Sequence, residues 1–393
     1  MNRYPSEFAP RSWAPKLRPT LVRLFSPIRR YKQSSETGLV RVDVQGVDRL
    51  QAAMNSNSRL MIAPNHSSHA DPFTIYAACD AAKTTCHIMA AWHVFMKFSP
   101  MMQRCLQWHG CFSVDREAND IGAFRNAIEV LRTRTEPLVI FPEGEIYHCN
   151  DRVMPFREGA AAIAVGAARK TDLPVAIVPT AIKYRYLDDP TQAILRVLDD
   201  IERRILWRTQ THKPIVERLY AIAEAVIGLK ELEYLGSPRS GDLSSRLREL
   251  GAEILQRQEL RHGPRREDAH PVRVKELRRT ILTKANDYKT TDDERKELSQ
   301  DLEDLFVVTQ LFSYPGDYLR VENPSIERIA ETVDKLEEDV LQRHTASIRG
   351  RRAAVVQFGS PIQVSAAKSR TVVSEITATV QSQVQSLLDQ LAN

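Results

Sequence analysis

The chain has 393 residues, 42% of them hydrophobic and 27% charged, which is the composition of a globular protein. Its net charge of +5 and its pI near 8.9 favour anionic partners, such as nucleic acid, phospholipid head groups or a phosphorylated cofactor. No apolar run reaches the roughly 18 residues of a membrane-spanning helix, so such a helix is not expected.

The five cysteines form no CxxC pair and no zinc-type spacing. An odd, scattered set indicates free thiols in a reducing compartment, and no metal site is predicted. The N-terminus also lacks the apolar core of a signal peptide. The sequence therefore predicts a cytoplasmic protein.

Residues 1–38 form a basic, proline-rich N-terminal segment. Up to Lys32 it carries eight Lys or Arg and a single acid, Glu7, and its five prolines exclude a long helix. Apolar residues recur in it at helical spacing: Leu17, Leu21, Leu24 and Ile28. The segment could lie as a short amphipathic piece on an anionic membrane, or it could be a disordered basic tail.

A histidine and an aspartate stand where a predicted strand gives way to a predicted helix. Residues 60–63 are apolar and indicate a buried strand, whereas residues 73–82 are rich in alanine and favour a helix. Asp71 is expected to cap this helix, with Pro72 in its first turn. His66 would then lie in the preceding turn, where a neutral imidazole could accept a proton from a hydroxyl and a carboxylate could fix its tautomer. Alternatively, Asp71 is only a cap and His66 only a structural polar residue.

Strands and helices alternate through the first half of the chain. Strands are predicted at 39–44, 87–90, 111–114, 137–141 and 175–179, and helices at 48–54, 121–132 and 160–169. This alternation is typical of an α/β layer. Because ligands bind beyond the carboxyl ends of strands in open α/β sheets, Glu143 and His66 are expected to point into one crevice. Arg116, also at a strand end, could hold a phosphate or could form a surface ion pair with Asp115.

Four short motifs occur in a fixed order. Asn65-His66 and Asp71 form a His-four residues-Asp motif. The other three are Lys97 and Pro100 with residues 110–116, Phe-Pro-Glu-Gly at 141–144, and Val-Pro-Thr at 178–180. Together they resemble the four blocks of the glycerolipid acyltransferases, the family of 1-acylglycerol-3-phosphate acyltransferase. The resemblance covers about residues 40–186, and its specificity lies in the order of the four blocks.

The resemblance implies an α/β fold of the glycerol-3-phosphate acyltransferase type, with a mixed central sheet flanked by helices. It also implies attack of a hydroxyl of a (lyso)glycerophospholipid-type acceptor on an acyl thioester of coenzyme A or acyl carrier protein. His66 would be the general base and Asp71 would orient it, with no covalent acyl-enzyme and no metal or other cofactor.

Four residues would bind substrate by the same resemblance. Arg116 would hold a phosphate or another anionic head group of the acceptor. Glu143 and Gly144 would shape the acceptor site near the glycerol hydroxyls, and Lys97 is a further candidate for contact with an anion.

The sequence departs from the family after the Phe-Pro-Glu-Gly block. The family usually continues with Thr-Arg-Ser, whereas residues 145–147 are Glu-Ile-Tyr. One expected phosphate donor is therefore absent and Glu145 adds a negative charge. Arg152 or Arg157 could replace the missing donor, or the acceptor could be a different hydroxylated lipid.

The second departure is a long insertion. The family's closing strand and Gly-x-Pro turn appear only at residues 353–362, which predicts one discontinuous acyltransferase domain of residues 39–187 and 350–393. Residues 188–349 would form a mainly helical insert, in which residues 291–294 are a capping box. The insert could be a lid, a dimer interface, a partner-binding arm or a packed appendage.

Two other functions stay open at this point. The chain could be a lipid-binding or scaffolding protein with an inactive acyltransferase fold. It could also be a lipid ester hydrolase, because Ser67, Ser68 and His69 are neighbours, although no Gly-x-Ser-x-Gly elbow accompanies them. The expected partners are a lipid acceptor, a thioester donor such as acyl carrier protein, and the inner face of an anionic membrane; nucleic acid is not expected.

Overall fold

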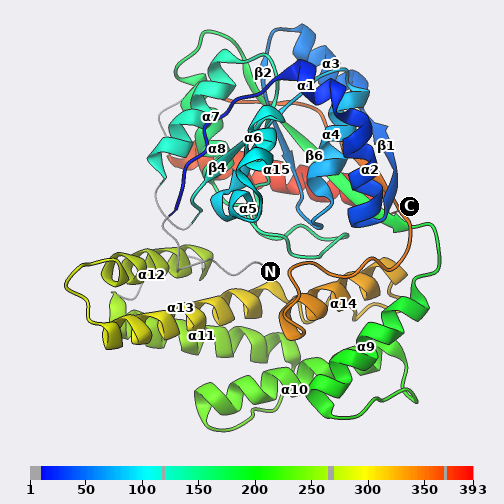
Figure 1. Cartoon of the computed structure of the whole chain (residues 1–393), viewed down its shortest axis with the longest axis vertical. Helices are drawn as coiled ribbons and strands as arrows, with labels where there is room; N and C mark the ends of the chain where they lie inside the picture. Colours follow the sequence, from blue (N-terminus) through cyan, green and yellow to red (C-terminus); the bar gives the residue numbers. More distant parts are fainter. Residues whose placement is uncertain (1–9, 117–119, 264–269, 367–369, 393) are drawn as a thin grey trace. The chain divides into compact units, whose positions relative to one another are not determined.

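The computed structural model describes residues 10–116, 120–263, 270–366 and 370–392. It divides into an α/β unit and a helical unit (Figure 1). The α/β unit contains residues 10–193, 326–335 and 345–392, and the helical unit contains residues 194–325 and 336–344. Residues 1–9 of the predicted basic segment lie outside the described residues.

The α/β unit is built on one mixed sheet of eight strands. The strands are β1 (Leu39–Gln45), β2 (Arg59–Pro64), β3 (His87–Ala91), β4 (Cys111–Val114), β5 (Leu138–Val139), β6 (Val175–Tyr186), β7 (Arg352–Phe358) and β8 (Ile362–Gln363). Their order is β1-β7-β6-β2-β5-β3-β4, with β8 also paired to β6. Only the pairs of β6 with β7 and β8 are antiparallel. The predicted mixed central sheet is confirmed.

Helices cover both faces of this sheet. One face carries α1 (Pro19–Leu24), α2 (Ser26–Thr37), α3 (Val47–Asn55), α4 (Asp71–Ala81), α5 (Trp92–Met96) and α6 (Pro100–Trp108), and the other carries α7 (Ile121–Thr133), α8 (Gly159–Ala168) and α15 (Arg370–Gln390). Figure 1 shows α7 beside α8 and α2 beside α4. Residues 10–38, expected to be a separate segment, thus contribute α1 and α2 to the α/β unit.

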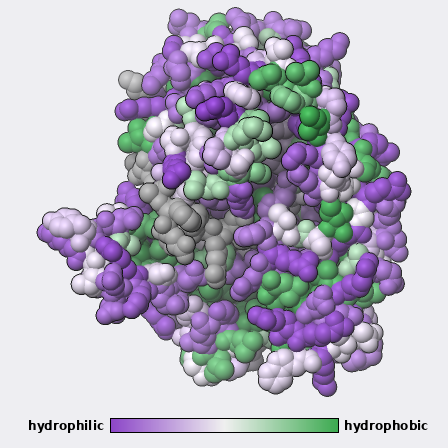
Figure 2. All heavy atoms as spheres, in the orientation of Figure 1, coloured by the Kyte–Doolittle hydropathy of each residue, from purple (hydrophilic) through white to green (hydrophobic). Residues whose placement is uncertain are grey.

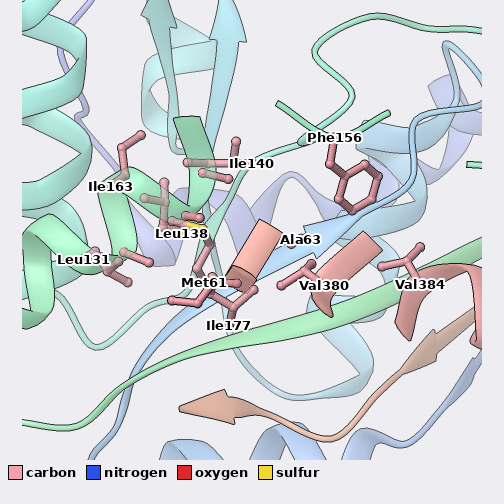
Figure 3. Packing of buried hydrophobic residues seen from close by; sticks show 14 of the residues in the cluster. Met61, Ala63, Leu131, Leu138, Ile140, Phe156, Ile163, Ile177, Val380 and Val384 are labelled. Carbon is pink, nitrogen blue, oxygen red and sulfur yellow. The ribbon is translucent and has the colours of Figure 1, made fainter. Parts of the chain in front are cut away.

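Each face has its own apolar core, because successive strand residues point to opposite sides. In β6, Ala176 and Val178 pack beneath α4, whereas Val175 and Ile177 pack beneath α8 and α15. Figure 3 shows the second core, in which Ile177 lies with residues from β2, α7, α8 and α15.

Two predicted helix starts differ from the structure. The helix predicted from Asp48 begins at Val47, with Gly46 as N-cap in the left-handed conformation at φ +70°. A Cβ at Gly46 would collide with the carbonyl oxygen of Phe358, so the close approach of β7 requires glycine here. The helix predicted after Asp71 includes Asp71 as its first residue and has Ala70 as N-cap, which leaves the Asp71 carboxylate available for other partners.

β6 extends past the end of β2, and two asparagine side chains take the place of the missing strand. Asn65 donates to the carbonyl of Ile182 (3.0 Å) and accepts from its N–H (2.7 Å). Asn150 pairs with Tyr184 in the same way, at 2.9 and 2.7 Å. Backbone groups of β6 are thereby satisfied, and one of the two asparagines, Asn65, directly precedes His66 in the sequence.

The helical unit is formed from α10 (Ile215–Leu235), α11 (Leu243–His262), α12 (His270–Ala285) and α13 (Asp292–Ser313), with parts of α9 (Thr191–Leu206) and α14 (Ile326–Val340). The predicted capping box is present, since Thr291 and Glu294 exchange hydrogen bonds at the start of α13. Leu250, Ile254 and Leu305 are fully or almost fully buried in its core.

Figure 2 shows one face of the protein, on which hydrophilic residues predominate and apolar residues form small groups. Among the described residues, no helix combines the length and the apolar composition that crossing a membrane requires.

Candidate active site

His66 lies in the turn that joins β2 to α4, and three contacts fix its position. Its backbone N–H donates to Glu143 Oε1 at 2.7 Å, and its ring stacks on Phe141 with the centroids 4.1 Å apart. Its Nδ1 lies 2.7 Å from Asp71 Oδ2. About a sixth of the side chain, 16%, is exposed, so the ring is held firmly but is not sealed from a substrate.

Asp71 is fully buried and its carboxylate is surrounded by donors. Oδ2 receives the N–H of Ser68 at 3.0 Å in addition to His66, and Oδ1 receives the hydroxyl of Tyr184 at 2.6 Å. Because Asp71 accepts from His66 Nδ1, the neutral ring carries its proton there and its Nε2 is left as the base. The pair has the arrangement that general base chemistry requires.

Glu143 is buried directly after the short strand β5. Burial raises the pKa of its carboxyl well above the usual range, the nearby charge of Asp71 raises it further, and the N–H donors of His66 and Met154 oppose the shift. Its Oε1 accepts from the N–H of His66 at 2.7 Å, and its Oε2 accepts from the N–H of Met154 at 3.2 Å. Glu143 therefore ties the loop after β2 to the loop after β5, as parallel neighbours in the sheet allow.

Arg116 and Gly144 also meet. The guanidinium of Arg116 donates to the carbonyl oxygen of Gly144 and forms an ion pair with Glu145 at 3.0 Å. Gly144 has φ +75°, and a Cβ there would collide with the guanidinium of Arg157. Glycine is thus required where the two arginines approach one short turn.

The structure brings together five of the six predicted site residues: His66, Asp71, Arg116, Glu143 and Gly144. The buried carboxylate of Glu143 binds the backbone of His66, and the crevice that the two side chains are expected to share stays a prediction. Lys97 is exposed at the C-cap of α5, and its contact with an anion stays a prediction. The chemical roles of all six are likewise predictions.

Sequence patterns did not indicate Tyr184, which lies far from Asp71 along the chain. It comes at the end of a strand and had no motif around it. They did indicate the acid at position 145, but not that it would pair with Arg116.

The family of this region follows from its sequence. Residues 41–183 match the model of the family described as Acyltransferase. They are an acyltransferase domain. The matched range contains all six predicted site residues, and it ends one residue before Tyr184.

One solved structure similar to the chain is that of the 1-acyl-sn-glycerophosphate (LPA) acyltransferase PlsC from Thermotoga maritima. It shares 18% sequence identity, and the match covers 41% of this chain and 57% of that enzyme with a TM-score of 0.29. The chain thus spans little more than half of that enzyme's length. No curated protein matches the chain by sequence.

Proposed function

We propose that the protein transfers a fatty acyl group from acyl-CoA or acyl carrier protein to a hydroxyl of a (lyso)glycerophospholipid-type acceptor. The observation that carries the proposal is the buried Asp71 bound to Nδ1 of a partly exposed His66 within an acyltransferase domain. Neither a metal nor another cofactor is needed for this chemistry.

His66 acts as the general base through its Nε2. It takes the proton of the acceptor hydroxyl as the oxygen attacks the thioester carbonyl. An ester C–O bond forms, the C–S bond breaks, and the leaving thiolate takes the proton from the imidazolium. Asp71 stabilises that imidazolium while it is charged.

Acceptor binding is assigned to the turn after β5. The backbone of Gly144 lies between Arg116 and Arg157, and cations in such positions suit an acceptor with an anionic head group. Arg152 stays an alternative. The acceptor and donor are drawn from a membrane surface in this proposal, with the protein bound peripherally through basic residues beside exposed apolar ones such as Leu24 and Ile28.

The test is transfer of a labelled acyl chain by the purified protein, with acyl-CoA and acyl carrier protein as donors and a panel of lysolipid acceptors. His66→Ala is expected to lower kcat by about a thousandfold, within the range for loss of a general base. Asp71→Asn is expected to lower it by about a hundredfold, because the ring loses its anionic partner. The matched control is His69→Ala, which removes a nearby imidazole that has no role in the proposed proton transfer.

The same assay separates the other functions. Release of free fatty acid without ester formation would identify a hydrolase, and binding of lipid without turnover of any donor would identify a scaffolding protein. Full activity in the His66 variant would exclude His66 as the base.

A further inference from the structure

The phenol of Tyr184 ends at the aspartate that holds His66. Its hydroxyl donates to Asp71 Oδ1 at 2.6 Å, while His66 Nδ1 lies 2.7 Å from the other oxygen. Tyr184 is 4% exposed and Asp71 is fully buried. A phenol, a carboxylate and an imidazole therefore form one continuous hydrogen-bonded chain that leads from the sheet to the base.

Tyr184 is itself fixed at both of its ends. The Asn150 side chain pairs with its backbone N–H and carbonyl, and the hydroxyl of Thr74 lies 2.8 Å from its phenolic oxygen. Because its own proton goes to Asp71, the phenol can only accept from Thr74, whose single hydroxyl proton also lies within reach of the Ala70 carbonyl at 3.1 Å. Thr74 belongs to α4 and Tyr184 to β6, so the phenol joins the helix to the sheet at the carboxylate.

A carboxylate on α4 alone could turn about its last side-chain torsion, which has a broad minimum. A donor from the sheet restricts that rotation and keeps Oδ2 directed at the imidazole. We infer that Tyr184 is a positioning residue for the transfer reaction, which acts on His66 through Asp71. The inference rests on the proposed function of His66 as the base.

Tyr184→Phe tests this role, because it removes only the hydroxyl. We expect kcat to fall about tenfold with the KM values of donor and acceptor unchanged, the loss that one hydrogen bond to a charged group accounts for. The acid limb of the pH profile of kcat/KM is expected to move to higher pH. Asp71 then shares less of its charge with a donor and stabilises the His66 imidazolium more strongly.

Other charged groups near this chain stay in place in the variant. The carboxyl of Glu143 still accepts from the backbone of His66, and the guanidinium of Arg352 still lies 5.2 Å from the centroid of the aromatic ring at 184. A shift of the acid limb of the pH profile therefore results from the loss of the hydrogen bond that the phenol donates to Asp71.

Tyr234→Phe is the matched control. Its phenol is also buried and donates to a carboxylate, that of Asp304 at 2.8 Å, but it belongs to the helical unit. We expect no change in kcat or in the limb. Thr74→Val is a second variant, made beside Tyr184. It should lower kcat by a smaller factor than Tyr184→Phe, since it removes the hydroxyl that contacts the phenol but leaves the phenol in place.

The ring nitrogens of His66, followed by NMR across pH, supply a readout that needs no turnover. A raised His66 pKa in Tyr184→Phe, with the neutral ring still protonated at Nδ1, supports the inference. Unchanged kcat, limb and ring signals would overturn it. Absence of transfer by the wild-type protein with every donor would refute the proposed function instead, while the NMR titration would still decide whether Tyr184 acts on His66.

Discussion

Glu145 sets the charge of the turn that is proposed to bind the acceptor. It pairs with Arg116 at 3.0 Å, with 11% and 20% of the two side chains exposed, so the guanidinium is already partly neutralised within the protein. An acceptor phosphate at this position would have to compete with a carboxylate. If this turn binds the acceptor as proposed, we expect the resident pair to favour acceptors of low negative charge over phosphate monoesters.

Glu145→Gln is predicted to change this preference. With the acid removed, Arg116 keeps its bond to the Gly144 carbonyl and gains capacity for an anion. We expect KM for a lysolipid with a phosphate monoester to fall by about tenfold, the scale of one charge-assisted hydrogen bond, and KM for a neutral monoacylglycerol to stay the same. Steady-state kinetics with the two acceptors checks this.

Glu129→Gln is the control for that measurement, because Glu129 pairs with Arg132 on the exposed side of α7. Equal changes for both acceptors, or no change for either, would show that Glu145 does not select the acceptor.

Contacts between site residues could be predicted where the residues are close in sequence. The pairing of His66 with Asp71 follows from their spacing across one turn, and the structure contains it. The contact of Asp71 with Tyr184 joins residues 113 positions apart. No pattern within a single strand specifies which helix terminus a tyrosine such as Tyr184 will reach, so this contact required the packed sheet.

At the scale of elements, one edge of β6 has backbone groups that bond to asparagine side chains in place of a neighbouring strand. Asn65 is 1% exposed and serves both backbone groups of Ile182. Asn65→Ala is predicted to lower the free energy of unfolding by about 2–5 kcal/mol, since each buried backbone group left unpaired costs about 1–3 kcal/mol. Chemical denaturation measures the loss.

Asn55→Ala, at the exposed end of α3, should stay within about 0.5 kcal/mol of the wild type. A loss equally small for Asn65→Ala would mean that water replaces the side chain at the strand edge.

The same asparagine hydrogen bonds explain why the strand predicted at 175–179 was shorter than β6. Its prediction ended at Pro179, which has no N–H for a neighbouring strand. The strand continues to Tyr186 because β7 pairs with one edge and the two asparagines serve the other. The helix α7 was predicted to within one residue, and the start of α13 was predicted by its capping box.

At the scale of the whole molecule, a substitution confined to one unit tests whether the two units unfold separately. The helical unit contains a buried ion pair in which Arg218, 1% exposed, binds Glu202 and Asp199. Arg218→Ala is predicted to destabilise this unit by about 3–5 kcal/mol, because the buried Glu202 keeps its charge without the guanidinium. Hydrogen exchange should show lower protection in α9 and α10 and unchanged protection in the sheet.

Arg203→Ala removes an exposed pair with Asp200 on the same helix and should cost less than about 1 kcal/mol. Loss of protection in both units at once would show that they unfold as one.

The boundaries of the units could be predicted only in part. The family's closing pattern indicated a strand at 353–358, and β7 does join the sheet. The division within α14 at residue 335 could not be predicted, because the amphipathic helix continues without interruption across it.

The position of β7 between β1 and β6 has a consequence for synthesis on the ribosome. Both neighbouring strands emerge early, but residues 187–351 must be translated before β7 can join them. At cellular elongation rates this takes about 10–30 s, during which the nascent chain presents two open strand edges. Chaperones that shield such edges are therefore expected to act on this protein before its last tenth has been made.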